Sequence, residues 1–257
     1  MARLRVLIPD LPRNTTTAYV RRHRRVRARR RRRQARSLHW HALGAVWAID
    51  GTWFDQPVVP LGRRALVIVE LASRQTLCVE SVPGERAAAV VPCLERLIAQ
   101  HGAPLVLKAD NGSAFVSRQL AELCLRHGVT LMHSPVRRPS WNGTCEVSGR
   151  WAKERATAAA RQRGSPDQLC QADLDCAVTF TGAMPRIDDA RREHFRAVVD
   201  QELGAVLAER GLVAGEQTSD HVRRSLGRVA VRRALQLCHI LTIEGRGYRQ
   251  WFPTPAA

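Results

Sequence analysis

Short apolar runs alternate with longer amphipathic stretches from about residue 40 to residue 181. The apolar runs are rich in β-branched residues and are bounded by turn-forming residues, which is typical of strands. The amphipathic stretches repeat apolar side chains at helical spacing and stop at Gly or Pro, which is typical of helices. We expect strands at 45–50, 65–71, 76–82, 104–110 and 129–134, and helices at 84–99, at 117–127, in a stretch ending near 163 and at 167–181.

The order of these elements indicates the fold class. Three strands joined by short connections are expected to form an antiparallel meander, and the last two strands each follow a helix, which permits parallel pairing. We therefore expect an α/β protein with helices on a mixed five-stranded sheet, in which the first and fourth strands can be neighbours.

The two ends of the chain differ from this middle part. Residues 1–39 are expected to form an N-terminal arm, because residues 21–36 hold eleven arginines and no acid and such runs are usually disordered. Residues 40–183 form the expected core. Residues 184–257 are expected to be mainly helical, with helices at 188–210 and 219–239 and two short strands within 240–252, as either a DNA-binding or a dimerisation unit.

Charge adds a partner class to this picture. The chain of 257 residues has a formal net charge of +18, and residues 21–36 supply 11 of these charges. Such a balance indicates an anionic polymer, most plausibly nucleic acid. No apolar run approaches the ~20 residues that span a bilayer, and the seven cysteines show no zinc-finger spacing. We therefore expect a cytoplasmic protein with free thiols and no membrane partner.

Three acids lie at the ends of the expected elements. Asp50 ends the first strand, Asp110 ends the fourth, and Glu146 opens the helix that follows a Pro-rich loop. If the first and fourth strands are adjacent, the three carboxylates meet at one edge and repel one another. A divalent cation with oxygen ligands, such as Mg²⁺, relieves that repulsion, and a pair of such ions can promote a phosphodiester displacement.

The sequence around each acid carries a resemblance. WAIDGTW (47–53), KADNGSAF (108–115) and SPVRRPSWNGTCEVSGRWAKER (134–155) are similar to the three blocks of the integrase core that retroviral integrases share with the DDE transposases of bacterial insertion sequences. Thirty-five residues separate Asp110 from Glu146, which is the spacing of that family. The resemblance covers about residues 40–165.

This resemblance implies a ribonuclease-H-like fold and a DNA polynucleotidyl transferase that cuts and joins DNA during integration and transposition. Asp50, Asp110 and Glu146 would be the catalytic residues and would hold Mg²⁺ or Mn²⁺, with two ions expected. The partners would be transposon-end DNA and target DNA, with a homo-oligomer assembled on DNA at the bacterial nucleoid and helper proteins unknown.

Several basic and polar residues are candidates for DNA contact. Arg150 and Lys153 follow Glu146 by four and seven positions, on the same helical face, although Glu146 and Arg150 could instead form an ion pair. Trp141 could stack on a base or pack against the protein, and His133 is more often structural than a ligand. The full set of expected DNA contacts is Arg150, Lys153, Asn142, Arg137, Arg138, Arg29, Arg30, Arg31, Arg32 and Arg33.

One departure from the family keeps an alternative function open. Bacterial relatives carry a helix-turn-helix module before the core, and about 39 residues are too few to hold one. We therefore expect a truncated or restarted reading frame, or recognition of the DNA end by another component. The alternatives to a strand-transfer enzyme are a catalytically idle DNA-binding fragment that acts as a repressor and a structure-specific nuclease of the same fold.

Overall fold

The computed structural model describes residues 17–18, 20–26, 37–84, 87–135, 141–212 and 220–244. They divide into two compact units, one of residues 40–241 and one formed by the described parts of residues 1–39 and 242–257. The strands are β1 Ser37–Trp40, β2 Val46–Val58, β3 Gly62–Glu70, β4 Gln75–Val82, β5 Val106–Ala109, β6 Thr130–His133 and β7 Leu241–Glu244. The helices of the larger unit are α3 Ala87–His101, α4 Arg118–Arg126, α5 Gly143–Gln162, α6 Gln171–Asp175, α7 Asp189–Glu209 and α8 Asp220–Leu237.

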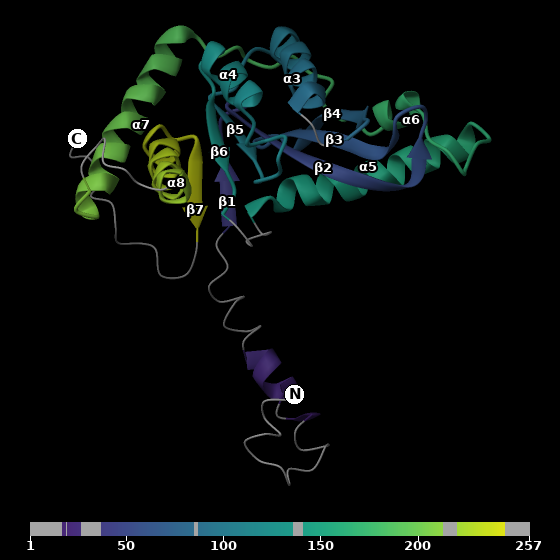
Figure 1. Ribbon diagram of the computed structural model, residues 1–257, viewed down its shortest axis with the longest axis horizontal. Helices are drawn as coiled ribbons and strands as arrows, with labels where there is room; N and C mark the ends of the chain where they lie inside the picture. The colour runs from purple at the N-terminus through teal and green to yellow at the C-terminus, as the bar shows by residue number, and fades with distance from the viewer. Residues whose placement is uncertain are drawn as a thin grey trace. The chain divides into compact units, whose positions relative to one another are not determined.

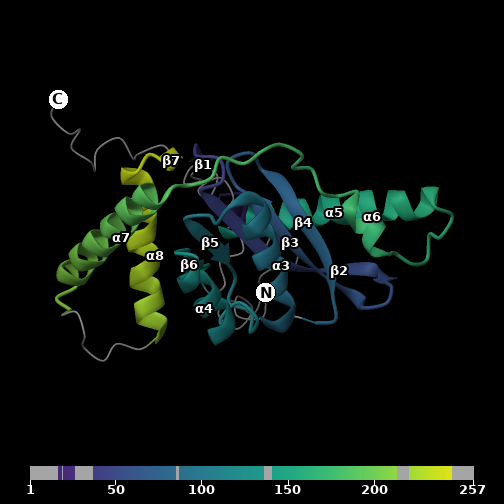
Figure 2. The same ribbon diagram turned by 90° about the horizontal axis from the view of Figure 1, so that it is seen from above.

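The larger unit is built on a mixed five-stranded sheet with the order β4-β3-β2-β5-β6. Strands β2, β3 and β4 form an antiparallel meander, and β5 and β6 run parallel to β2 after the crossovers through α3 and α4. This arrangement confirms the expected α/β fold class with a mixed five-stranded sheet, in which the first and fourth core strands are neighbours. Helices α3 and α4 cover one face of the sheet and α5 covers the other (Figures 1 and 2).

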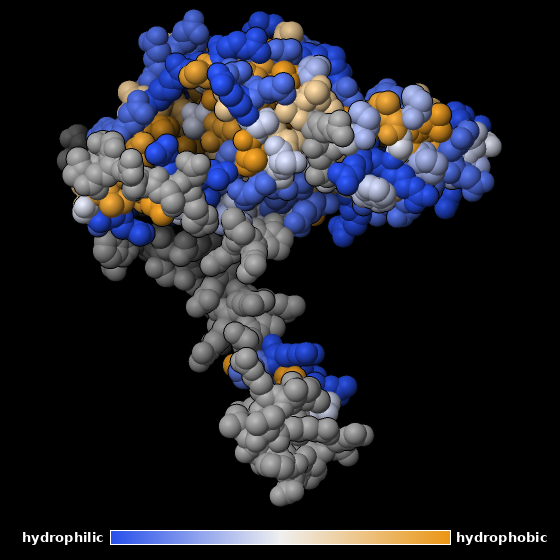
Figure 3. All heavy atoms as spheres, in the orientation of Figure 1, coloured by the Kyte–Doolittle hydropathy of each residue, from blue (hydrophilic) through white to orange (hydrophobic). Residues whose placement is uncertain are grey.

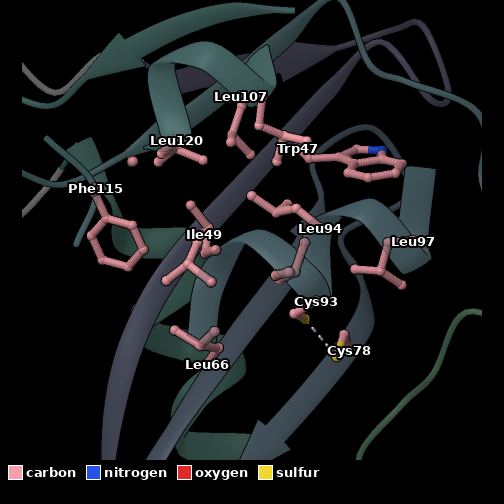
Figure 4. Packing of buried hydrophobic residues seen from close by; sticks show 14 of the residues in the cluster. Trp47, Ile49, Leu66, Cys78, Cys93, Leu94, Leu97, Leu107, Phe115 and Leu120 are labelled. Carbon is pink, nitrogen blue, oxygen red and sulfur yellow. Dashed lines mark hydrogen bonds between the residues drawn. The ribbon is translucent and has the colours of Figure 1, made fainter. Parts of the chain in front are cut away.

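The main hydrophobic core lies between the sheet and the pair α3 and α4. Alternate residues of β2 and β5 enter it, because side chains of a strand point to opposite faces in turn. Figure 4 shows Trp47, Ile49 and Leu107 packed against leucines of α3 and α4. The intervening residues of the same strands, Lys108 among them, therefore face the α5 side of the sheet.

Helix α5 approaches this second face closely because its buried side is made of small residues. Ser148, Gly149, Ala152, Ala156 and Ala160 are buried. A Cβ atom on Gly149 would lie 3.4 Å from Thr52 Oγ1 of β2. The small residues thus set the distance between the helix and the strand that carries Asp50.

Helices α7 and α8 form an antiparallel pair beside the β6 edge of the sheet (Figure 2). Arg233 of α8 pairs with Glu209 of α7 at 2.8 Å. Arg192 of α7 donates to the carbonyl oxygens of Ala103 and Pro104, each at 2.8 Å, and to that of Gly128 at 3.2 Å. These bonds satisfy backbone acceptors of two loops of the sheet and fix the first turns of α7 against it.

Three expectations about the elements need correction. The first core strand does not end at Asp50, since β2 continues to Val58 through its antiparallel pairing with β3. The helix expected at 167–181 is limited to α6, because the backbone of Thr179 and Phe180 donates instead to Thr76 O of β4 at 3.0 and 3.1 Å. The strand near 241 has β1 as its described partner, and the second strand expected within 240–252 lies outside the described residues.

Candidate functional site

The sheet register brings Asp50 and Asp110 to neighbouring positions on one face. Strands β2 and β5 pair in parallel with Ala48 opposite Lys108, and two residues further along each strand lie Asp50 and Asp110. Both side chains therefore point toward the face that α5 covers. The parallel pairing stops at Lys108 while β2 runs on, so the carboxylates lie where the two strands separate.

The turn after β5 holds the Asp110 side chain in place. The backbone N–H of Gly112 donates to Asp110 Oδ1 at 2.8 Å, and the Asn111 side chain donates to Ser134 O at 2.7 Å. A Cβ atom on residue 112 would lie 3.0 Å from Asp110 Oδ1 and 3.3 Å from the Phe115 ring. Glycine at position 112 therefore allows the backbone to approach the Asp110 carboxylate closely.

The start of α5 brings the third acid to the same place. The pKa of Asp50 is raised from 3.8 to about 6, because burial and the Asp110 and Glu146 carboxylates together outweigh the lowering effect of the Gly51 backbone and the Asn142 amide. The three expected acids and Asn142 thus share one electrostatic neighbourhood. Asp50 and Asp110 are partly exposed, and Glu146 is exposed.

The donor set at this site suits a hard divalent cation. Three carboxylates are present, and burial together with the neighbouring carboxylates disfavours the ionised form of Asp50, which a cation would stabilise. Asn142 is 6% exposed, and although its amide lies near Asp50, neither its nitrogen nor its oxygen completes a hydrogen bond of normal geometry. A polar side chain left in this state beside three acids indicates room for a ligand.

Lys108 is a further residue at the site, to which sequence reasoning gave no role. It is 5% exposed and faces the α5 side together with Asp50. Burial lowers the pKa of Lys108, and the nearby Cys145 and Asp50 partly offset that effect. The available signal was a lysine inside an otherwise apolar strand, in a chain with only one other lysine, Lys153.

Among the described residues, the cluster of potential metal ligands with all ligand atoms within 4.8 Å is a different one, Cys78, Glu80 and Cys93. The two sulfur atoms lie 3.6 Å apart. Arg96 Nη2 lies 3.8 Å from the first sulfur and 3.9 Å from the second, and it pairs with Glu80. A guanidinium therefore already compensates this cluster, and we assign no metal to it.

The expected DNA contacts fall into two groups. Arg150 is exposed and Lys153 is partly exposed on the solvent side of α5, whereas Asn142 is buried beside Asp50. Arg137, Arg138 and Arg29 to Arg33 lie outside the described residues. Within the ranges that the structure describes, no ion pair joins Glu146 to Arg150, so Arg150 stays available to another anion.

Two other expectations concern neighbouring side chains. The His133 ring nitrogen Nε2 lies 2.9 Å from Phe115 O, which gives this histidine a structural partner. All seven cysteines are free, as expected. In the described part of the chain, no helix is both long enough and apolar enough to cross a lipid bilayer.

Comparison with known proteins finds similarity to a family model and to retroviral polyproteins. Residues 41–139 match the model of the integrase core domain, a range that includes Asp50 and Asp110 and ends before Glu146. The chain is 30% identical over 127 residues to the Gag-Pol polyprotein of Gibbon ape leukemia virus and 31% identical over 127 residues to that of Koala retrovirus. Each match covers 48% of this chain and only 7% of the relative.

Solved structures show weaker likeness. The HTLV-2 integrase catalytic core domain in complex with magnesium is 18% identical, with a TM-score of 0.44 over 53% of this chain and 83% of that one. The catalytic core domain of BIV integrase is 25% identical, with a TM-score of 0.42 over 55% of this chain and 91% of that one. Residues 41–139 of this chain are thus similar to the integrase core domain.

Proposed function

We propose that this chain is a DNA integrase or transposase that cuts a phosphodiester bond and joins the resulting end to another DNA strand in a metal-dependent reaction. The observation that supports the proposal is that Asp110 and Glu146 both act on Asp50, whose pKa is raised to about 6 by its burial and by these carboxylates. The family match over residues 41–139 supports the same reaction class.

Each part of the site has a role in this proposal. Asp50, Asp110 and Glu146 hold Mg²⁺ or Mn²⁺, and when bound, two such ions would assist both the attacking and the leaving oxygen of a phosphodiester displacement. The Asn142 amide lies beside Asp50 and favours its ionised form, and Gly112 N–H fixes the Asp110 carboxylate. Arg150 and Lys153 bind the phosphates on either side of the scissile bond.

The partners follow from the reaction. The chain acts on the DNA at the end of a mobile element and on target DNA, as a homo-oligomer assembled on them. The expected basic residues outside the described ranges, Arg137, Arg138 and Arg29 to Arg33, add affinity for the phosphate backbone without base specificity.

A joining assay tests the proposal. Full-length protein is incubated with supercoiled plasmid and an oligonucleotide with a free 3′ hydroxyl, in Mg²⁺ or Mn²⁺, and joined product is measured. We expect joined product from the wild-type chain and from Asp167→Asn, an exposed acid outside the site, and at least ~10²-fold less from Asp110→Asn and Glu146→Gln. Equal activity of Asp110→Asn and the wild type would remove the catalytic assignment. Cleavage without joining would favour the nuclease, and DNA binding without either would favour the repressor.

A further inference from the structure

A cavity of about 260 Å³ lies between the edge strand β6 and the helices α7 and α8. Its floor is apolar, with Met132 of β6, Val199 and Leu203 of α7 and Val231 of α8 among the lining residues. Figure 3 shows a hollow with a hydrophobic floor and a hydrophilic rim on this side of the molecule. The first two helices of the C-terminal segment thus leave a space at the sheet edge instead of closing on it.

The rim of this cavity is strongly basic. Arg223, Arg224 and Arg228 of α8 line it, together with His133 of β6. Arg224 and Arg228 are four residues apart and face the same side of the helix. Three arginines at one rim repel one another unless an anion lies among them.

Arg228 lies partly buried beside Arg224. Burial lowers the pKa of Arg228, and Arg224 lowers it further. Among the residues that the structure describes, no acid pairs with Arg228, whereas Arg233 on the same helix pairs with both Glu202 and Glu209. The guanidinium of Arg228 is therefore held partly out of water beside another cation without a counter-charge, an arrangement that an incoming anion would stabilise.

The cavity adjoins the proposed catalytic site. His133 lies within the electrostatic reach of Arg224 and Arg228 on one side and of Asp110 on the other. Asn111, the neighbour of Asp110, bonds Ser134, the neighbour of His133. A DNA strand that is bound at Asp110 can therefore extend past His133 to the arginines at the rim of the cavity.

We propose that this cavity binds a phosphate group of a nucleic-acid strand, with the sugar over the apolar floor and the phosphate between the guanidinium groups of Arg224 and Arg228. Guanidinium groups match the geometry of phosphate oxygens, and the volume exceeds the space that one phosphate needs. The inference rests on the proposed function in one respect, because the nucleic-acid strand bound in the cavity is the one that continues to the catalytic site. Free inorganic phosphate offers the same chemistry and is tested separately.

Salt dependence of DNA binding measures these contacts directly. Full-length wild-type protein, Arg228→Gln and the triple variant R223Q/R224Q/R228Q bind a fluorescent duplex oligonucleotide in EDTA over a range of salt concentrations. Each lost phosphate contact lowers the slope of log K against log salt by about 0.9. Because the proposal places one phosphate among these arginines, we expect the triple variant to lose about 1 unit of slope and ~10-fold in affinity at low salt.

Matched controls separate this effect from loss of folding or of overall charge. Arg63→Gln removes one exposed arginine from β3 and should keep the wild-type slope. Arg228→Lys keeps the charge and should retain most of the slope that Arg228→Gln loses. If Arg63→Gln lowers the slope as much as Arg228→Gln, only general charge matters and the cavity assignment is overturned.

The remaining outcomes separate this inference from the proposed function. If the wild type neither cuts nor joins DNA but the triple variant loses slope, the cavity assignment stands and the proposed function fails. If the wild type joins DNA and the triple variant keeps the full slope, the cavity assignment alone is overturned. If inorganic phosphate raises the melting temperature of the wild type but not of the triple variant, and the slope is unchanged, the cavity takes free phosphate and the nucleic-acid assignment is overturned.

Discussion

At the scale of single residues, the Asp50 carboxylate lowers the stability of the folded protein and at the same time favours the binding of a cation. Asp50 is held beside two other carboxylates, and its pKa is raised from 3.8 to about 6. Such an arrangement weakens the folded state whenever Asp50 is ionised, because the unfolded chain ionises at lower pH. Binding-site residues often lower the stability of the folded free protein in this way, since the ligand that relieves the repulsion is absent from it.

Asp50→Asn should therefore stabilise the metal-free protein while abolishing DNA joining. The raised pKa means that the carboxylate of the wild type contributes no penalty below pH 3.8 and its full penalty above about pH 6. In EDTA, the free energy of unfolding of the wild type should fall relative to Asp50→Asn across this window and then stay lower by roughly 2–3 kcal/mol. Urea unfolding between pH 4 and pH 8 measures the difference.

Metal addition provides the opposite control for Asp50. Millimolar Mg²⁺ or Mn²⁺ should raise the melting temperature of the wild type at pH 8 and should have a much smaller effect on Asp50→Asn, because ligand binding stabilises only the state that binds it. An equal rise in both proteins would show that the ion binds elsewhere.

At the scale of elements, helix α5 sets the geometry of the site through its small residues. Ala156 is 0% exposed and lies on the side of α5 that packs against the sheet, whereas Ala158 on the same helix is exposed. A larger side chain at the buried position must push the helix away from β2 and β3, and Glu146 moves with it.

Ala156→Leu should consequently lower both stability and activity. We expect a loss of ~1–3 kcal/mol in the free energy of unfolding, because extra methylene groups in a packed interior force a shift of the backbone. Joining activity should fall more than ~10-fold even where the protein is fully folded. Ala158→Leu is the matched control and should change neither quantity by much, and a comparable loss in that variant would contradict the packing argument.

The loop and short helix after α5 depend on a single carboxylate. Asp173 accepts hydrogen bonds from Arg163 Nη2 at 2.7 Å and from the backbone N–H of Cys170 at 2.8 Å. Hydrogen bonding from Arg163 lowers the pKa of Asp173, and the Cys170 N–H lowers it further. The depressed pKa means that this stabilisation is present above the unfolded-state pKa and is lost as the pH falls through the folded-state value.

Asp173→Asn should cost about 1 kcal/mol at pH 7, the usual effect of losing a helix cap. The difference between this variant and the wild type should shrink as the pH is lowered below 4, because the wild-type carboxyl is then protonated. Thermal unfolding at several pH values measures it, with the exposed Asp167→Asn as the control. A difference that grows on acidification would contradict the assigned direction.

These elements also show which parts of the fold and of the site can be predicted from the sequence. The strands and helices of the core follow from local pattern, and the meeting of Asp50 with Asp110 follows from placing the first and fourth strands side by side. The irregular path near Thr179 could not be predicted, because its helical pattern is overridden by backbone bonds to Thr76 of a distant strand. The burial of Lys108 could not be predicted either, since it depends on which face of the sheet α5 covers.

At the scale of the whole molecule, positive charge is divided among parts with different tasks. Residues 21–36 hold eleven of the arginines, Arg150 and Lys153 lie on α5 next to the acids, and Arg223, Arg224 and Arg228 line the cavity at the β6 edge. The last two groups have fixed positions relative to the acidic site within residues 40–241. These two groups can therefore determine where a bound strand lies relative to Asp110.

Deletion of residues 21–36 should reduce affinity without changing where the DNA is cut. Each arginine that releases counterions contributes about 0.9 to the slope of log K against log salt, so the loss should be several units and at most about 10. At low salt and saturating protein, the deletion variant should still join DNA at the wild-type positions, because the acidic trio and the arginines of α5 and α8 are retained. Mapping of the joined products by sequencing, together with binding isotherms at several salt concentrations, measures both quantities. An unchanged slope would show that the arm does not contact DNA, and altered joining positions would show that it also directs the strand to the site.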